Sequence, residues 1–340
     1  MKLKLVFLIL LFFSNNCISY TLFETKFNEI NFISENIKND KEKKIKKLKS
    51  NDFKNILKKT LTKNDYNNIE KNLSDIFINN FIKSINIDQE KIINNNYFAN
   101  IKINFDKNKL INYFRSNSIG YVEYIPRKMF VIIYEKNKIG NNFLSKNNSY
   151  YNYLENNPSN FFLMPKLDIN DRFIINEVNI ENKDISKIDK LLRKYSHNES
   201  IIIYSNKIEN NYFYKIYYYN NSEFYLIKEM QIDNQDIENF FYNLYPEVIN
   251  SWKKYNIIDN KLRDILNCNI KFFNINELKE IKKIILNISQ VDKIILKEIS
   301  HKNNNYDLSY FGNKEFLINS FNYYNLLINF QDTECNISLK

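Results

Sequence analysis

The chain has 340 residues and a formal charge of +10, and 44% of its residues are hydrophobic and 16% aromatic. This apolar content supplies material for packed cores and argues against a disordered chain, and the length predicts two or three domains. Because only 3 glycines are present, the glycine-rich loops of P-loop and dinucleotide-binding proteins are excluded.

The chain begins with a short apolar segment that is typical of a secretory leader. Lysines precede an apolar run at residues 5–13, which is well below the ~20 residues that a membrane-spanning helix needs. Cys17 and Ser19 then occupy the −3 and −1 positions of a cut before Tyr20, where a leader peptidase prefers small side chains. We therefore expect residues 1–19 to be a signal peptide, cleaved between Ser19 and Tyr20, and the mature protein to be periplasmic.

Two alternatives would tether the protein to a membrane. In the first, Cys17 is the lipid-modified first residue of a lipoprotein, although the preceding Ser14, Asn15 and Asn16 fit such a site poorly. In the second, the leader stays uncleaved as a short anchoring helix. No later stretch is apolar for long enough to span a bilayer, so the remainder is expected to be water-soluble.

Lysine supplies almost all of the positive charge. The densest basic run, residues 38–50, has helical spacing and also contains Asp40 and Glu42, so we interpret it as a solvated helix face rather than a lipid-binding surface. An exported protein rarely meets nucleic acid, so we expect no nucleic-acid partner despite a pI of about 9.1.

Residues 20–125 are predicted to form an α+β domain. The expected elements are a strand at 21–34, amphipathic helices between 37 and 81, an alternating strand at 96–106 and a helix at 107–117. Gly120 and Pro126 then mark the end of this domain.

Residues 126–233 are predicted to form a mixed α/β domain. Its expected elements are buried strands at 128–136 and 160–168, a helix beginning after Asp184, and an antiparallel meander at 200–208, 211–220 and 223–231. Residues 234–260 follow as a linking helix that Pro246 is expected to bend, and its aromatic stripe is predicted to pack between domains.

The tail, residues 261–340, reads β-α-β-β-α-β and ends in a hairpin, which predicts a ferredoxin-like domain. The first and last strands are neighbours in that topology, and Cys268 and Cys335 would both point into the core. In an oxidising compartment this pair predicts a disulfide. The alternative is that both thiols stay reduced and pack as small hydrophobic side chains.

Few residues are candidates for catalysis or metal binding. His197 and His301 lie in separate polar turns without a second ligand at metal spacing, so we expect solvent-facing side chains, and we expect no cofactor. Asp168 and Asp171 form the one carboxylate cluster that we single out, and we interpret it as a self-capping turn rather than a glycosidase-like pair.

Several of these segments also resemble a known family. The phrase KKTLT at 58–62, the strand YFANIKINFD at 97–106 and the IGY connector at 119–121 are similar to an uncharacterised bacterial envelope family, domain of unknown function 2066. Residues 184–220 are similar to its second half, which resembles the amino-terminal domain of the periplasmic protein TolB. The similarity covers most of the chain after the leader, although this chain is poorer in Pro, Gly, Arg and Trp. The resemblance implies an exported protein and gives no catalytic residues to carry over.

Three classes of function remain open from the sequence. The leading hypothesis is a non-enzymatic envelope protein that binds an envelope protein or component through stacked α+β domains. A carboxylate-dependent periplasmic hydrolase would need a cleft that gathers carboxylates with shifted pKa values, whereas a broad apolar patch would favour the binder. A carrier of hydrophobic ligands would need an enclosed apolar cavity.

Overall fold

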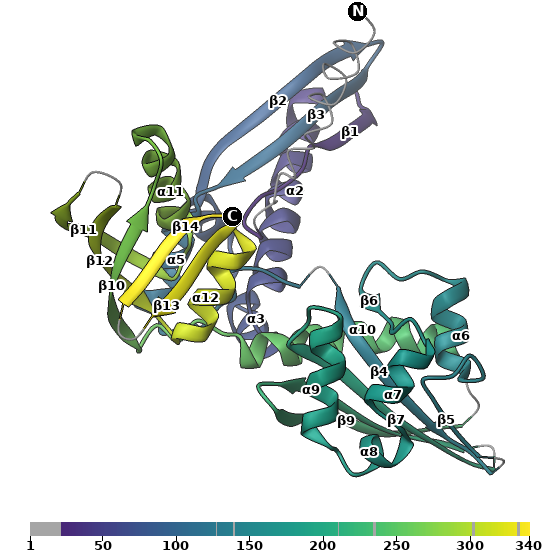
Figure 1. The fold of residues 1–340 in the computed structure, drawn as a ribbon. Coiled ribbons are helices and arrows are strands. Elements are labelled where there is room, and N and C mark those ends of the chain that lie inside the picture. Colours follow the sequence, from purple (N-terminus) through teal and green to yellow (C-terminus); the bar gives the residue numbers. More distant parts are fainter. Residues whose placement is uncertain are drawn as a thin grey trace, which may run out of the picture. The chain divides into compact units, whose positions relative to one another are not determined.

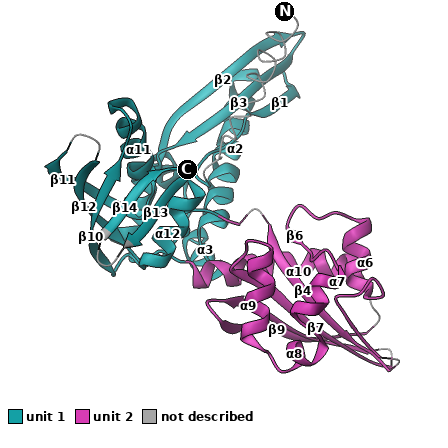
Figure 2. Ribbon diagram, in the orientation of Figure 1, with its two compact units in different colours: residues 1–124, 257–340 teal, residues 125–256 magenta. Residues whose placement is uncertain are grey.

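The computed structural model describes residues 22–126, 128–138, 140–209, 211–233, 236–300, 303–331 and 334–340. The chain forms two compact units, one of residues 1–124 with 257–340 and the other of residues 125–256 (Figure 2). Both units combine helices with sheets, which confirms the predicted α+β class. Among the described helices, none is both long and apolar enough to cross a membrane. The leader, with Cys17 and the cleavage site Ser19–Tyr20, lies outside the described residues.

The observed units differ from the expected segments in two respects. Residues 20–125 and 261–340, which we expected as separate domains, share one unit. Hydrogen bonds join them, because Lys107 and Arg115 donate to the carbonyl oxygens of Asn287 and Ser289. The expected linking helix, α10 (Ile237–Tyr255), belongs to the other unit, where it packs against strands of its own sheet. Patterns along the chain do not reveal the first set of contacts, because these join segments far apart in sequence. For α10, the pattern shows an apolar face but not which sheet covers it.

The first unit begins with a three-stranded antiparallel sheet and the helices around it (Figure 1). Its strands, in the order β1-β3-β2, are β1 (Asn28–Ile33), β2 (Ile82–Ile93) and β3 (Asn96–Phe105). Its helices are α2 (Ile37–Thr60), α3 (Lys63–Glu70), α4 (Asp75–Asn79) and α5 (Lys107–Ser116). β3 alternates strictly between buried and partly exposed residues, as predicted, and α2 packs on its buried face.

The sequence did not predict β2. Eleven of its twelve residues are exposed, so it has no buried face whose alternation would reveal a strand. Its partner β3 instead supplies the hydrogen-bonding template, and the tertiary structure decides its conformation.

Asp52 is a buried acid on α2, and it provides a test of this packing. It is 9% exposed, Asn28 of β1 donates a side-chain bond to it at 3.4 Å, and burial raises its pKa to about 6. Because the folded state holds its proton more tightly than the unfolded state, stability falls as pH rises from about 4 to about 6.

Asp52→Asn should therefore raise the free energy of unfolding at pH 7.5 by about 1–3 kcal/mol and leave it nearly unchanged at pH 3.5. Denaturant unfolding at both pH values measures the difference. Glu29→Gln, at an exposed position of β1, controls for the loss of one negative charge. An equal effect of Asp52→Asn at both pH values would contradict the prediction.

The tail forms a five-stranded sheet covered by helices on one face. Its elements are β10 (Arg263–Lys271), α11 (Ile275–Asn287), β11 (Val291–Ile299), β12 (Asn303–Phe311), α12 (Lys314–Tyr323), β13 (Leu326–Gln331) and β14 (Glu334–Leu339). The strand order is β11-β12-β10-β14-β13. This is the predicted ferredoxin-like alternation with one difference, since β14 inserts between β10 and β13 and displaces β13 to the edge.

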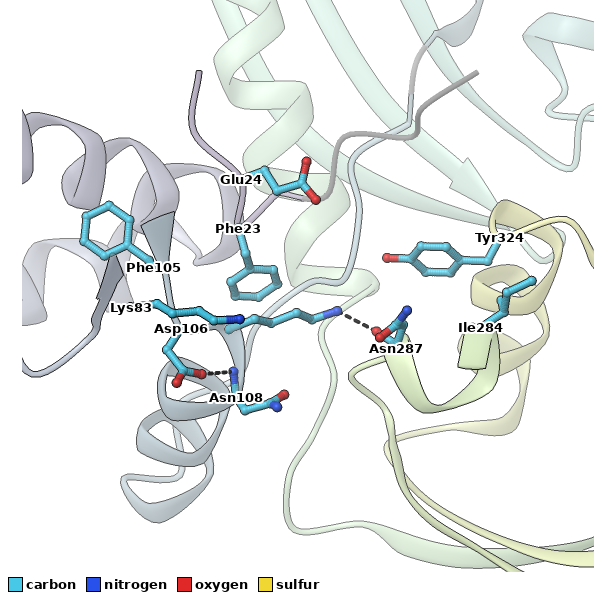
Figure 3. Close-up of a pocket in the computed structure, with 10 residues that line it drawn as sticks. Phe23, Glu24, Lys83, Phe105, Asp106, Asn108, Ile284, Asn287 and Tyr324 are labelled. Carbon is cyan, nitrogen blue, oxygen red and sulfur yellow. Dashed lines mark hydrogen bonds between the residues drawn. The ribbon is translucent and has the colours of Figure 1, made fainter. Parts of the chain in front are cut away.

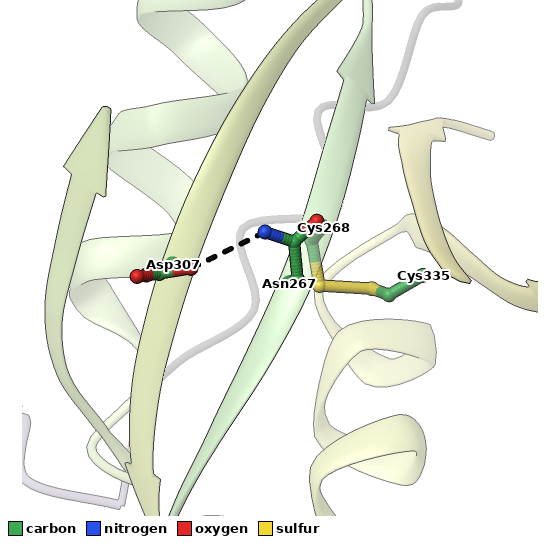
Figure 4. The surroundings of a disulfide bond; sticks show 4 residues. All are labelled: Asn267, Cys268, Asp307 and Cys335. Atoms are coloured by element: carbon green, nitrogen blue, oxygen red, sulfur yellow. Dashed lines mark hydrogen bonds between the residues drawn. A yellow bond between two sulfur atoms is a disulfide. The ribbon is translucent and has the colours of Figure 1, made fainter. Parts of the chain in front are cut away.

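The insertion of β14 brings the two predicted cysteines together. β14 pairs with β10 in parallel, and Cys268 and Cys335 are direct partners in that register. Their sulfur atoms are bonded at 2.16 Å, and both residues are 1% exposed within the core (Figure 4).

The second unit is built on a mixed sheet with strand order β5-β4-β7-β8-β9, and β6 also pairs with β4. The strands are β4 (Met129–Lys136), β5 (Asn141–Phe143), β6 (Phe162–Leu163), β7 (Glu199–Ile208), β8 (Asn211–Asn220) and β9 (Glu223–Asp233). The helices besides α10 are α6 (Ser149–Asn156), α7 (Ile169–Ile174), α8 (Glu177–Glu181) and α9 (Ile185–Lys194). The antiparallel meander β7-β8-β9 is as predicted.

Two features of this unit differ from expectation. The short helices α7 and α8 were not predicted, because one or two turns give too few residues for a helical period. The aromatic stripe of α10 packs inside its own unit, where Phe240 stacks on Tyr214 and Phe241 contacts Phe162. The stripe is therefore core of this unit.

Candidate functional site

Asp168 and Asp171 form the self-capping turn that the sequence analysis favoured. Asp168 is the N-cap of α7 and accepts a bond from the Asp171 N–H at 2.9 Å. Asp171 is fully buried and accepts from the Tyr195 hydroxyl at 2.7 Å, and Lys194 donates to both carboxylates. The backbone bond and Lys194 lower the pKa of Asp168, whereas a general acid needs a raised pKa. The pair therefore has the geometry of a cap and an ion pair.

Of the two histidines, the structure describes only His197. His197 is partly buried, with its ring 5.4 Å from that of Phe130, and burial lowers its pKa, so our expectation of a solvent-facing side chain is wrong. The turn that carries His197 packs against Phe130 of β4, and this contact is not visible from the residues around His197 in the sequence. His301 lies outside the described residues. Within the described ranges, no three acidic, histidine or cysteine side chains gather as a metal site would require.

A polar cleft of about 580 Å³ lies in the first unit, between the start of α5 and the ends of α11 and α12 (Figure 3). Its lining includes Glu24, Lys83, Asp106 and Lys107. The Asp106 carboxylate caps α5, accepting from backbone N–H groups at 3.0 and 3.1 Å. Lys107 donates to the carbonyl oxygen of Asn287 at 2.6 Å, so its ammonium joins segments that lie far apart in sequence.

Glu123 is the buried anion beside this cleft. Its side chain is fully buried and accepts from Lys107 Nζ at 2.9 Å, from the Tyr324 hydroxyl at 2.7 Å, and from the backbone N–H and hydroxyl of Ser289. Burial and the neighbouring Glu123 raise the pKa of Tyr324. A carboxylate that accepts so many bonds is a poor general base, so this network is suited to holding two segments together. The sequence contains no signal for it, because Ser289 and Tyr324 lie 166 and 201 residues away from Glu123 along the chain.

A second hollow, of about 700 Å³, opens at one end of the tail sheet. We call it the apolar pocket; its lining is Lys271, Phe272, Phe273, Glu277, Ser300, Asn303, Ser338 and Leu339. β10 ends there, β12 begins there, and the ladder pairs Lys271 with Asn303.

Large apolar side chains stand exposed at and near this pocket. Phe273 is 90% exposed, and nearby Ile299 and Ile275 are 77% and 59% exposed. Local structure fixes the connection that carries Phe273, since Glu277 accepts its backbone N–H at 2.7 Å and Asn274 caps α11. Exposed apolar patches of this kind mark interaction sites. The sequence pattern placed Phe272 and Phe273 at the end of a strand but could not show that Phe273 faces solvent.

No family model, curated protein or solved structure matches the chain. The resemblance to the envelope family therefore stays a prediction. The function is therefore inferred from the polar cleft and the apolar pocket.

Proposed function

We propose that the protein is an exported, non-enzymatic binding or assembly factor of the cell envelope, and that it binds a protein partner through the apolar pocket. The observation that carries the proposal is the exposure of Phe273 beside a pocket of about 700 Å³. The predicted leader supports export. A broad apolar patch is also the feature that separates a binder from a hydrolase.

The chemistry of the pocket fits a protein interface. Phe272, Phe273 and Leu339 supply an apolar centre, and Lys271 and Glu277 supply a charged rim. Interfaces combine an apolar, often aromatic centre with a polar rim, and a few central aromatic side chains carry most of the binding energy. The partner that fits is a polypeptide with an apolar side chain for the pocket.

A hydrophobic-ligand carrier is a second candidate, since the same lining would receive an acyl or aromatic group. A carrier site buries most of the surface of its ligand. Phe273, which lines this pocket, is itself 90% exposed, so a ligand beside it would stay open to solvent. A carboxylate-dependent hydrolase gains no support from the polar cleft, because Asp106 caps a helix and Glu123 accepts from Lys107, Ser289 and Tyr324.

Site-specific photocrosslinking in the cells that produce the protein tests the proposal. We expect a photoreactive phenylalanine analogue in place of Phe273 to give one defined protein adduct, and Phe273→Ser to weaken that partner's binding about 30-fold or more. The matched control is the same analogue in place of Phe173, which is 78% exposed on the second unit. Equal adducts at both positions, or none at Phe273, would refute the proposal. An adduct of small mass would support the carrier instead.

A further inference from the structure

The edges of the sheets differ in how they are protected. A sheet edge offers unpaired backbone groups, and charged residues and β-bulges normally block pairing with another chain. β2 has two register shifts and carries Lys83, Asp88, Glu90 and Lys91. β11 likewise has two register shifts and carries Asp292, Lys293, Lys297 and Glu298. β9 contains four charged residues and pairs across one register shift.

β13 lacks these protections. It pairs with β14 alone, and its sequence, LLINFQ, contains no charged residue. The pairing of β13 with β14 has no register shift. Leu326 is fully buried and Ile328 is 7% exposed on the core face, while Leu327 is 39% exposed. An uncharged, regular edge is suited to pairing with another strand.

Every second residue of β13 points its backbone N–H and C=O groups to the open edge of the sheet. The Lys340 N–H donates to the carbonyl oxygen of Asn325 at 3.1 Å, so this carbonyl faces β14. The N–H of Leu326 belongs to the same peptide group and therefore points to the open edge. Because the direction alternates along a strand, Leu326, Ile328 and Phe330 all present their N–H and C=O groups outward.

These positions match those of a second β13 running in the opposite direction. An antiparallel pair centred on Ile328 places Ile328 opposite itself and Leu326 opposite Phe330, so every outward group meets an outward group. A slip of one residue would turn the partner's groups away. The same register sets Leu327 opposite Asn329 on the open face, and no like charges meet.

We infer that two copies of this chain associate through β13, so that the two tail sheets join into one continuous sheet. This inference goes beyond the proposed function and does not rest on it. The partner at this edge is a second copy because the strand is self-complementary in register, in apolar face and in lack of charge.

Sedimentation equilibrium of the full chain tests the association. We expect a dimer that dissociates on dilution, and Leu327→Lys should weaken it at least about tenfold because it places an ammonium group on each strand near the two-fold axis. The matched control is Leu296→Lys, since Leu296 is 43% exposed on the opposite edge strand, β11. A wild-type chain that stays at its own mass at every concentration, or a dimer that Leu327→Lys leaves intact, would overturn the inference.

Cysteine crosslinking tests the register and does not depend on a destabilising charge. Chains with Leu327→Cys, mixed with chains with Asn329→Cys under mild oxidation, should form a mixed disulfide, because opposed side chains lie about 4.5–5.5 Å apart at Cβ. Chains with Asn336→Cys on the inner strand β14 serve as the control and should stay uncrosslinked. Crosslinking no faster than in this control would also overturn the inference.

Discussion

Glu123→Ala should lower the free energy of unfolding of the first unit by about 3–5 kcal/mol. The change removes a fully buried carboxylate and leaves Lys107, Ser289 and Tyr324 without their shared acceptor. Removing a buried acceptor costs far more than its bonds contribute, because the Ser289 and Tyr324 donors stay buried without it, although Lys107 keeps its bond to the Asn287 carbonyl oxygen.

Denaturant unfolding followed by far-UV circular dichroism measures this loss. Fluorescence of the single tryptophan, Trp252, reports on the second unit and provides an internal reference whose transition should move little. Lys43→Ala is the control, since it breaks an exposed ion pair with Asp40 and should cost less than about 1 kcal/mol. Similar losses for Glu123→Ala and Lys43→Ala would show that the network does not hold the unit together.

Loss of the Cys268–Cys335 bond should destabilise the first unit by roughly 4 kcal/mol in the chain-entropy model. The bond closes a loop between residues that are 67 positions apart, so the unfolded chain is strongly restricted. The double substitution Cys268→Ala/Cys335→Ala, which keeps the positions apolar, should show this loss in denaturant unfolding without reductant.

Two measurements control this prediction. Reductant should destabilise the wild-type protein but leave the double variant unchanged. Thiol titration of the denatured, unreduced protein with Cys17→Ser should find no reactive thiol, because Cys268 and Cys335 are the only other cysteines. Two reactive thiols per chain would show that the bond does not form.

Local patterns predicted much of the fold. The alternation of Ala99, Ile101 and Ile103 predicted β3, and the order of elements in the tail predicted the ferredoxin-like alternation. That topology made Cys268 and Cys335 neighbours, and the structure places them in direct register. These predictions succeeded because strand and helix periods and short connections are properties of residues near one another in sequence.

Such local reasoning found only one of the candidate sites. Asp168 and Asp171 were found because a cap is a local motif, and they form an ion-paired cap. Glu123 was not found, because its partner Ser289 is 166 residues away. Phe273 was placed in a strand segment, but its exposure depends on where β12 and β14 begin and end.

The sequence by itself therefore determined the α+β class, most helices and strands and the meander of the second unit, and it made Cys268 and Cys335 candidates for a disulfide. Only the tertiary structure decided that the first and last segments share a unit, that β14 displaces β13 to an edge, and that Phe273 faces solvent. The physical reason is that burial and edge position depend on distant partners, whereas periodicity and capping depend on neighbours along the chain.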